Sequence, residues 1–271
     1  MRRFTNFLGA LALLPALAQV TGGPVSRLTT PRLSPRQHSS MRFHRLRYDG
    51  TWESENWSGY AVTGSSFTET MGSWTVPTVN CTTTPNTYAS FWTGFDGFSS
   101  NSVEQTGTDS DCNGKVPLYY AWYEFYPQPS YLVPILVSPG NRMSAQVVYS
   151  NSEFTITILN LTTGQSYSKS AKVNGAVRSS AEWIAEAPCC TNRGGILPLS
   201  DFGTVSLGAD NTGIAETNYA IDAALTKLTP IGGFGSNKQV ITMVSTTGAA
   251  EAVPSSLTAD GTSFTVAWKS E

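Results

Sequence analysis

Short runs of aromatic and β-branched residues, interrupted by Gly, Pro, Asn or Ser, dominate this chain from Thr51 onward. Runs of this length between turn residues are typical of β-strands. Phe154–Ile158 alternates apolar and polar residues, and Thr162-Thr163-Gly164 then turns the chain toward Ser166–Val173, which predicts a hairpin. The other expected strands are Trp57–Val62, Met71–Val76, Ala89–Phe95, Leu118–Phe125, Met143–Tyr149, Ala181–Ala185, Thr204–Leu207, Gln239–Val244 and Ser263–Trp268.

Sustained helical periodicity is nearly absent from the same stretch. Only Ala220–Lys227 could form a short helix, and it could equally be an edge strand. Many strands separated by frequent turns favour a sandwich, and a body of about 220 residues fits one domain of that kind. We therefore expect residues 51–271 to fold as an all-β, antiparallel two-sheet β-sandwich of the concanavalin-like kind.

The N-terminus has the pattern of a secretory signal peptide. Arg2 and Arg3 precede an apolar run, Phe7–Ala18, that ends on the small-residue pattern Ala16-Leu17-Ala18. The run is too short to span a bilayer comfortably. Residues 1–18 are therefore predicted to be a signal peptide, and the protein to be secreted and not bound to a membrane.

Residues 19–50 differ from the body in charge. Residues 1–50 hold eight Arg and one acid, a net of +7, whereas residues 51–271 hold nine Lys or Arg and eighteen acids, a net of −9. A basic, Pro- and Ser-rich stretch is typical of a disordered tail, but it also suits a largely disordered pro-segment that docks on an acidic body. Nucleic-acid binding is disfavoured, because the basic residues lie in the part expected to be removed.

Histidine is missing from the body of the chain. His38 and His44 both lie before Thr51. This excludes a Ser-His-Asp or Cys-His mechanism and the usual His-ligated zinc site from the body. General acid–base chemistry then requires carboxylates, Lys, Tyr or Cys, and no metal or organic cofactor is expected.

Four cysteines and three N-glycosylation sequons are consistent with the predicted secretion. Cys81, Cys112, Cys189 and Cys190 allow three disulfide connectivities, of which Cys81 with Cys112 is the preferred first pair. Sequons begin at Asn56, Asn80 and Asn160. Each is a glycan site only if its Asn is exposed; chance matches in a Ser/Thr-rich chain are the alternative.

Five local strings place acids or amides among large aromatic residues. Alternation along a strand sends Trp122 and Glu124 to one face. Likewise Glu182, Ile184 and Glu186 share a face. An apolar setting raises the pKa of a carboxyl group, which suits a proton donor or acceptor. The strings are Asn56–Val62, Phe91–Gly97, Gln105–Asp109, Ala121–Pro127 and Ala181–Glu186.

In order and spacing these strings resemble the glutamic peptidases (eqolisins), over most of the body from Asn56 to about Leu207. The resemblance implies a secreted acid endopeptidase that acts on proteins or peptides, with the β-sandwich fold and an N-terminal pro-segment that inhibits it. It places the catalytic pair on Gln105 and Glu182. It also implies substrate-binding or supporting roles for Trp92, Asp96, Asp109, Trp122 and Glu124.

Three positions depart from the family pattern. Glu104 precedes Gln105 where an apolar residue is more usual, Phe125 replaces a common tryptophan, and Pro188-Cys189-Cys190 follow the second acid of the Glu motif. These departures bear on subsites, disulfides and pH optimum. Two other functions use a similar sandwich: a glycoside hydrolase with acids such as Glu124 and Glu182, and a lectin-like carbohydrate-binding domain. A monomer is expected.

Overall fold

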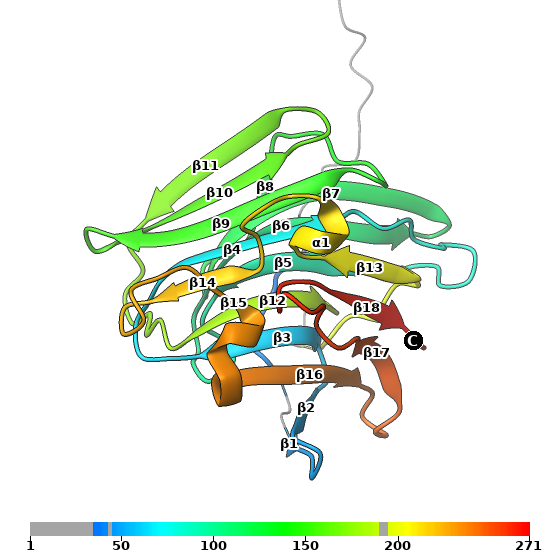
Figure 1. Cartoon of the computed structure of the whole chain (residues 1–271). Helices are drawn as coiled ribbons and strands as arrows, with labels where there is room; N and C mark the ends of the chain where they lie inside the picture. The colour runs from blue at the N-terminus through cyan, green and yellow to red at the C-terminus, as the bar shows by residue number, and fades with distance from the viewer. Residues whose placement is uncertain (1–34, 43–44, 190–194) are drawn as a thin grey trace, which may run out of the picture. The chain divides into compact units, whose positions relative to one another are not determined.

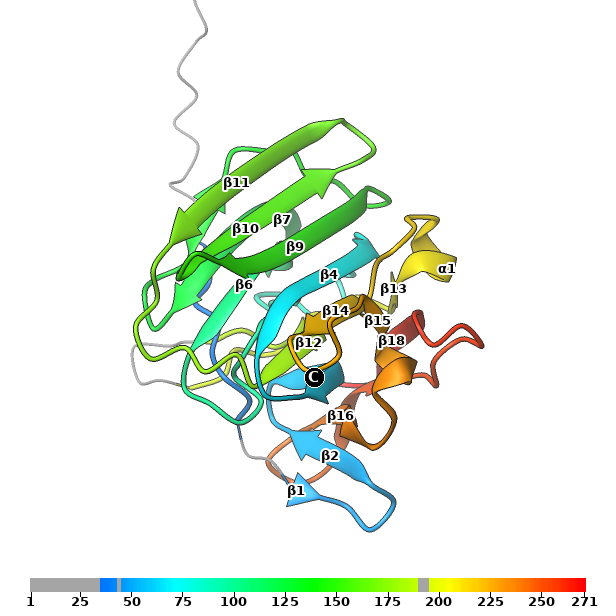
Figure 2. The ribbon, with the colours of Figure 1, turned by 60° about the vertical axis from the view of Figure 1, so that its left-hand side comes forward.

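The computed structural model describes residues 35–42, 45–189 and 195–271, so the predicted signal peptide lies outside the described residues. Residues from Ser34 onward form one compact unit. Figure 1 and Figure 2 show two packed layers of strands in this unit. Among the described residues no helix is long and apolar enough to cross a membrane. The predicted all-β sandwich is confirmed.

The first layer, here called the site sheet, contains nine hydrogen-bonded strands. It is antiparallel in the described residues except for β2 and β16, which run parallel. In order across the sheet the strands are β8 (Tyr131–Val133), β7 (Val116–Tyr126), β6 (Val103–Asn113), β5 (Ser90–Phe95), β12 (Ser180–Glu186), β3 (Trp57–Thr63), β16 (Lys238–Val244), β2 (Thr51–Ser54) and β1 (Arg45–Leu46).

The second layer, here called the outer sheet, covers one face of the first. Its strand β17 pairs with β16, which joins the two sheets at one side. Two short helices, α1 (Ala209–Thr212) and η1 (Ile231–Asn237), lie in its connections. The strands are β11 (Gln165–Ala171), β10 (Glu153–Asn160), β9 (Arg142–Ser150), β4 (Phe67–Thr75), β14 (Tyr219–Asp222), β15 (Thr229–Pro230), β13 (Thr204–Leu207), β18 (Phe264–Trp268) and β17 (Ala250–Pro254).

Every strand expected from the sequence is present, including the hairpin of β10 and β11. For Ala220–Lys227 the sequence allowed either a short helix or an edge strand. The first residues of this stretch form a strand, since β14 ends at Asp222 and pairs with β4. The long strand β6 was not predicted. Its sequence VEQTGTDSDCN is polar and Gly-containing, which is typical of a loop, yet all but its last residue are buried.

The core lies between the two sheets. Alternate residues of the site sheet, among them Phe91, Phe95 and Trp183, point toward the outer sheet and are buried in one apolar cluster. The indole of Trp183 also donates to the Met71 carbonyl oxygen of β4 at 2.8 Å, so this large core side chain links the two layers without an unpaired donor. The opposite face of the site sheet is left to the residues of the candidate site.

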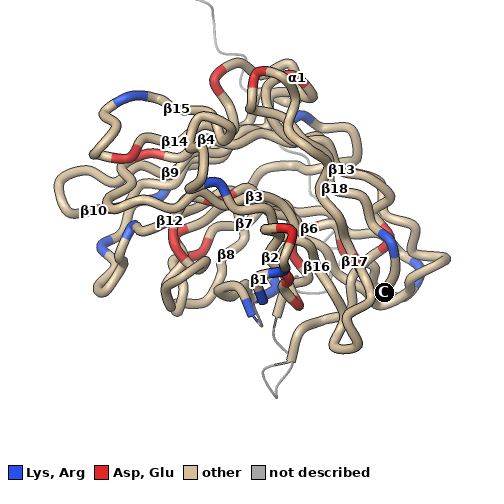
Figure 3. Tube along the Cα trace, turned by 60° about the horizontal axis from the view of Figure 1, so that its bottom comes forward, with Lys and Arg blue, Asp and Glu red and all other residues tan. Residues whose placement is uncertain are grey.

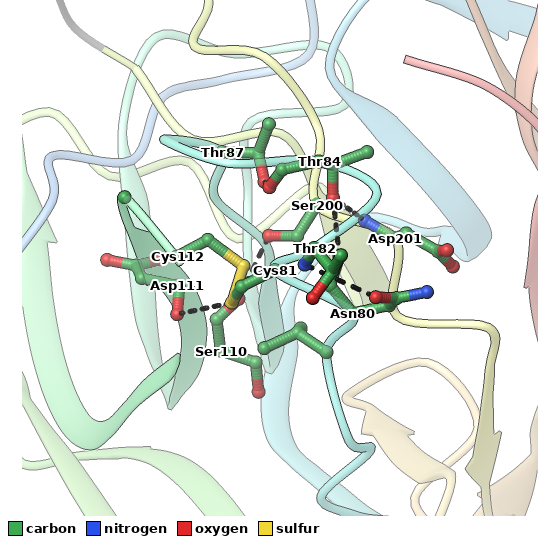
Figure 4. The surroundings of a disulfide bond; sticks show 12 residues. Asn80, Cys81, Thr82, Thr84, Thr87, Ser110, Asp111, Cys112, Ser200 and Asp201 are labelled. Carbon is green, nitrogen blue, oxygen red and sulfur yellow. Dashed lines mark hydrogen bonds between the residues drawn. A yellow bond between two sulfur atoms is a disulfide. The ribbon is translucent and has the colours of Figure 1, made fainter. Parts of the chain in front are cut away.

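The disulfide joins the end of β6 to the loop before β5 (Figure 4). Cys81 and Cys112 are bonded with a Cα–Cα distance of 5.3 Å, which confirms the predicted first pair. Thr82 and Thr84 turn the adjoining loop back on Asn80. Cys189 is also disulfide-bonded, whereas its neighbour Cys190 lies outside the described residues. The bridge holds the strand that carries Gln105.

The asparagines of the three sequons differ in their exposure to solvent. Asn56 and Asn160 are buried, and the side-chain amide of each donates hydrogen bonds inside the protein. Asn80 is exposed. Of the three, only Asn80 is open to a glycan in this fold.

Removal of the bridge with Cys81→Ser and Cys112→Ser should lower the free energy of unfolding by about 3 kcal/mol. The bridge closes a loop with a sequence separation of 31, and cross-links of that size chiefly restrict the unfolded chain. Guanidinium unfolding of the double variant and the parent measures the difference. A loss well under 1 kcal/mol would contradict the anchoring role.

Candidate active site

A row of residues crosses four neighbouring strands of the site sheet at one level. Glu182 of β12 lies directly opposite Gly94 of β5, Gly94 opposite Gln105 of β6, and Gln105 opposite Glu124 of β7. Directly opposed residues of antiparallel strands point to the same face. The three polar side chains therefore share one face, here called the polar face, which is the face turned away from the core.

Gly94 lets strand β6 approach β5 closely at this level. A Cβ atom at Gly94 would lie 2.7 Å from the Glu104 carbonyl oxygen and 2.8 Å from Gln105 Cβ, closer than real Cβ contacts come. Glu182 and Gln105 therefore lie on the same face on either side of β5, with no side chain on β5 between them. The structure thus brings the two predicted catalytic residues into one row.

A second row of polar residues lies four positions along the same strands. Glu186, Ser90, Asp109 and Tyr120 are opposed in turn across β12, β5, β6 and β7. Asp109 accepts hydrogen bonds from the Ser90 hydroxyl and, at 2.8 Å, from the Tyr120 hydroxyl. Between the two rows, Gly107 separates Trp92 from Trp122, so both indoles fit on the polar face.

Hydrogen bonds fix several of these side chains. Gln105 Nε2 donates to Glu124 Oε2 at 2.9 Å, and Trp92 Nε1 donates to Glu186 Oε2 at 2.8 Å. The bond to Glu124 sets the orientation of the Gln105 amide, and Gln105 Oε1 has no protein partner among the described residues. Neither carboxyl oxygen of Glu182 has one either. Both members of the predicted pair thus have hydrogen-bonding capacity to spare, as do Glu124 Oε1 and Trp122 Nε1 on the same face.

Asp96 lies at the end of β5 and serves the loop that leads into β12. Its carboxylate accepts the backbone N–H groups of Val177, Arg178 and Ser179 at 2.9, 2.7 and 2.9 Å. Three such bonds hold the chain just before the strand that carries Glu182. The predicted residues Trp92, Asp109, Trp122 and Glu124 lie on the polar face, whereas Asp96 supports it from the rim.

Burial raises the pKa of nearly every acid on the polar face. For Glu182 burial is the main cause, with the charges of Asp96 and Glu104 adding to it. For Glu124 burial comes first and the charge of Glu186 second. Burial also raises the pKa of Glu186 to about 8 and that of Asp109 to about 7. The buried acids of this face therefore hold protons well above their ordinary range.

Glu104 lies on the core face, not on the polar face. It is opposite Phe95 and Phe125, both members of the apolar core, and neither of its carboxyl oxygens has a hydrogen-bond partner among the described residues. Burial, with a smaller contribution from the charge of Asp96, raises its pKa to about 9. The departure from the family pattern thus puts a neutral carboxylic acid into the core behind Gln105.

Residues 36–42, here called the docked segment, lie on the polar face. The His38 ring stacks on the Trp122 indole with centroids 3.6 Å apart, and the His38 N–H donates to Glu124 Oε2 at 3.3 Å. The Ser39 N–H donates to Glu186 Oε1 at 3.2 Å. The segment thus covers the face that carries the predicted catalytic pair.

Both ends of the docked segment are held. Arg36 contacts Asp111 of β6, with Nε 3.6 Å from Oδ2, and its guanidinium lies 4.2 Å from the centre of the Tyr88 ring. At the other end the Met41 N–H donates to the Gly97 carbonyl oxygen at 3.0 Å. Beyond it, Figure 3 shows basic and acidic residues side by side at β1 and β2, where Arg45 and Arg47 pair with Glu53.

Sequence reasoning did not name Glu186 or His38 as residues of this site. The sequence puts Glu186 on the same face as Glu182, and the even spacing of four positions between the two acids was the signal. His38 carried no local signal. Only the opposite charges of the segment and the body indicated that the segment could dock.

A two-sheet sandwich whose polar face offers carboxyl, amide and indole groups, on a body without histidine, has the equipment of a glutamic-type endopeptidase. Comparison with known protein families supports this assignment. A profile described as the Peptidase A4 family matches residues 55–254, and the chain belongs to that family. The resemblance seen in the motifs is confirmed, and the glycoside hydrolase and lectin alternatives are not favoured.

Two curated relatives are similar in sequence. Aspergillopepsin-2 of Aspergillus niger is 29% identical over 259 residues, which cover 83% of this chain and 91% of the relative. Scytalidopepsin B of Scytalidium lignicola is 32% identical over 170 residues, 60% of this chain and 64% of the relative.

Two solved structures are similar in fold. Scytalido-glutamic peptidase with a transition state analog inhibitor has a TM-score of 0.65 at 24% identity and covers 79% of this chain and 98% of its own. Aspergilloglutamic peptidase from Aspergillus niger has a TM-score of 0.57 at 27% identity, covering 68% and 99%. These likenesses support the sandwich described above.

Gly94→Ala should distort the row and lower activity. The added methyl meets the backbone of Glu104 and the Cβ atom of Gln105, neither of which can rotate away, so we expect a cost of about 1–3 kcal/mol in unfolding free energy and loss of most peptidase activity. Gly140→Ala is the control, because a Cβ there meets nothing within 4 Å although its φ is +79°. Equal activity in the two variants would contradict the geometry.

Glu104→Gln should flatten the alkaline side of the stability profile. The folded-state pKa of Glu104 is raised, so its contribution is fully present below the unfolded value of 4.5 and is lost as the pH rises toward about 9. The parent chain should lose up to about 1.4 kcal/mol per pH unit relative to the variant over that window. Urea unfolding at several pH values checks this, with the exposed Glu216→Gln as control. Parallel profiles for parent and variant would contradict it.

Proposed function

We propose that this chain is a secreted acid endopeptidase that hydrolyses peptide bonds in proteins at the polar face, with Glu182 and Gln105 as its catalytic pair. Peptidase activity of the glutamic type follows from the family; the pair, the secretion and the mechanism are the proposal. The observation that supports the pair is the row that places Glu182 and Gln105 on one face, with Gly94 as the residue between them.

In the proposed reaction Glu182 acts first as a base and then as an acid. Ionised Glu182 takes a proton from a water molecule while that water attacks the scissile carbonyl carbon. The proton then passes to the departing amine, and the peptide C–N bond breaks to leave a carboxylic acid and an amine. Positioned proton transfer of this kind contributes roughly two to four powers of ten to the rate.

Gln105 positions the water and stabilises the oxyanion. One N–H of its amide is used by Glu124, which leaves the second N–H and Oε1 for the reacting groups. An uncharged donor keeps its function in acid, where a carboxylate would be protonated. A well-placed oxyanion donor contributes roughly 3 kcal/mol to the stabilisation of the transition state.

The ionisation of Glu182 depends on whether the polar face is covered. In the covered state burial raises the Glu182 pKa well above its ordinary 4.5. Water that enters once the docked segment leaves reduces the desolvation cost and lowers this pKa toward the ordinary value. An active enzyme with a Glu182 pKa near that value has its working range in acid.

The rest of the N-terminal stretch enters the proposal as a pro-segment. Residues 19–50 would inhibit the enzyme until they are removed, which is supported by the position of residues 36–42 over Trp122, Glu124 and Glu186. Protein and peptide substrates would bind the face that the segment leaves. We propose that the mature enzyme is a monomer.

Replacement of either member of the pair should abolish peptidase activity. The processed chain should cleave haemoglobin at about pH 3, near or below the ordinary carboxyl pKa values, and pepstatin should not inhibit it. Glu182→Gln and Gln105→Ala should each lower kcat by at least 10²-fold. Glu186→Gln, on the same face, should retain more activity, and Glu153→Gln in β10 should retain all of it.

Three results would contradict this function. One is the absence of cleavage by a correctly processed chain at every acid pH. A second is unchanged kcat in Glu182→Gln or Gln105→Ala. The third is hydrolysis of a glycoside that depends on Glu124 and Glu182 but not on Gln105, since two carboxyl groups suffice for that reaction.

A further inference from the structure

His38 fills a pocket on the polar face that fits a neutral imidazole. Its ring is fully buried and lies nearly parallel to Trp122, at an interplanar angle of 15°. Nδ1 lies 3.4 Å from Glu186 Oε2, and Nε2 lies 3.9 Å from Asp109 Oδ1. An aromatic floor with an acid near each ring nitrogen makes a specific site for this one side chain.

We propose that this pocket is the pH-sensitive lock of the zymogen: neutral His38 holds the docked segment on the polar face, and protonation of His38 in acid releases it. The proposal rests on the proposed function in taking the polar face as the active site. The acid that activates the catalytic groups would then also uncover them.

The surroundings of His38 offer no charge to balance an imidazolium in acid. The ionisable groups that face it are Glu186 of β12, Asp109 of β6 and Glu124 of β7, and the pKa of each is raised by burial. Around Asp109 lie Asp111, whose pKa is raised to about 6, and the Tyr120 hydroxyl. Arg36, on the segment itself, adds a positive charge that pairs with Asp111. The raised pKa values of Asp109, Asp111 and Glu186 all lie above the value of about 4 for His38, so these carboxyl groups are neutral by the pH at which the imidazole would take up a proton. Protonated His38 would then be a buried cation without a charged partner.

The sign of the linkage follows from these shifts. Burial lowers the His38 pKa from 6.5 to about 4. The contribution of His38 to the docking equilibrium is therefore fully present above pH 6.5 and is lost as the pH falls toward 4. The difference of about 2.5 units corresponds to a roughly 300-fold weaker docking equilibrium. Burial of the acids acts in the opposite sense: because it raises their pKa values, its contribution is present in acid and is lost as the pH rises. The Arg36–Asp111 contact acts in the same sense as His38, because Arg36 lowers the Asp111 pKa and the contact is lost as Asp111 takes up a proton. Among the groups that face the His38 ring, His38 itself is the one whose pKa is lowered by burial.

Hydrogen–deuterium exchange of the docked segment measures docking directly. The amide N–H groups of residues 38, 39, 41 and 42 donate hydrogen bonds to the body. The full chain should carry Glu182→Gln, which prevents self-cleavage and changes a side chain that bonds nothing in the segment. After correction for intrinsic exchange, protection of these amides should fall by about tenfold per pH unit between pH 6.5 and 4.

Two variants make the test specific. His38→Phe keeps a ring for Trp122 but cannot take up a proton, so protection should persist to pH 4. His44→Phe is the matched control for the other histidine of the chain and should behave as the parent does. The proposal is overturned if protection in the parent does not fall with pH, if His38→Phe releases as the parent does, or if His44→Phe alone abolishes release. Release in acid in the full chain, together with no peptidase activity in the processed chain, would instead overturn the proposed function alone.

Discussion

The candidate site depends on the backbone pairing of β12, β5, β6 and β7. Strands β5, β6 and β7 follow one another in the chain, whereas β12 comes from a distant part of it, and the register of all four places Glu182, Gly94, Gln105 and Glu124 in one row. A slip of one residue in any strand would turn its polar residues into the core and its core residues outward. The core residues Phe91, Phe95 and Trp183 therefore specify the site as firmly as the polar residues themselves.

The same pairing explains how so many acids remain buried. Glu182, Glu186, Asp109 and Glu124 come from three of these four strands, and each has a raised pKa, with burial as the main cause. Burial of these acids costs less free energy in acid, where the carboxyl groups are neutral, than near neutral pH. Near neutral pH the docked segment offsets part of this cost, because it supplies backbone donors to Glu124 and Glu186 and an arginine to Asp111.

Much of the fold could be predicted from strand-length runs of apolar and β-branched residues. Strand β6 could not, because its residues pair across a buried polar face and carry no apolar alternation to reveal it. The same strand carries Gln105 and Asp109, so the local pattern was weakest where the site lies. Asp96 shows another limit: its motif position left open whether it binds substrate or supports the site, and only the structure shows that its carboxylate accepts three backbone N–H groups of the loop before β12.

The position of Glu104 needed the structure for a similar reason. Sequence placed it next to Gln105, but alternation along β6 sends the two side chains to opposite faces. The position of His38 was the hardest to predict, since no pattern in residues 35–42 indicates which side chain contacts Trp122. Contacts between segments distant in sequence are set by the fold as a whole and leave no local trace.

The most direct test of the catalytic pair is a crystal structure of the processed chain with a peptide-based transition-state analogue. The account predicts that the hydroxyl groups that mimic the tetrahedral centre contact the Gln105 amide nitrogen and the Glu182 carboxyl group, above Gly94. An analogue held instead between Glu124 and Glu186, with Glu182 untouched, would contradict it.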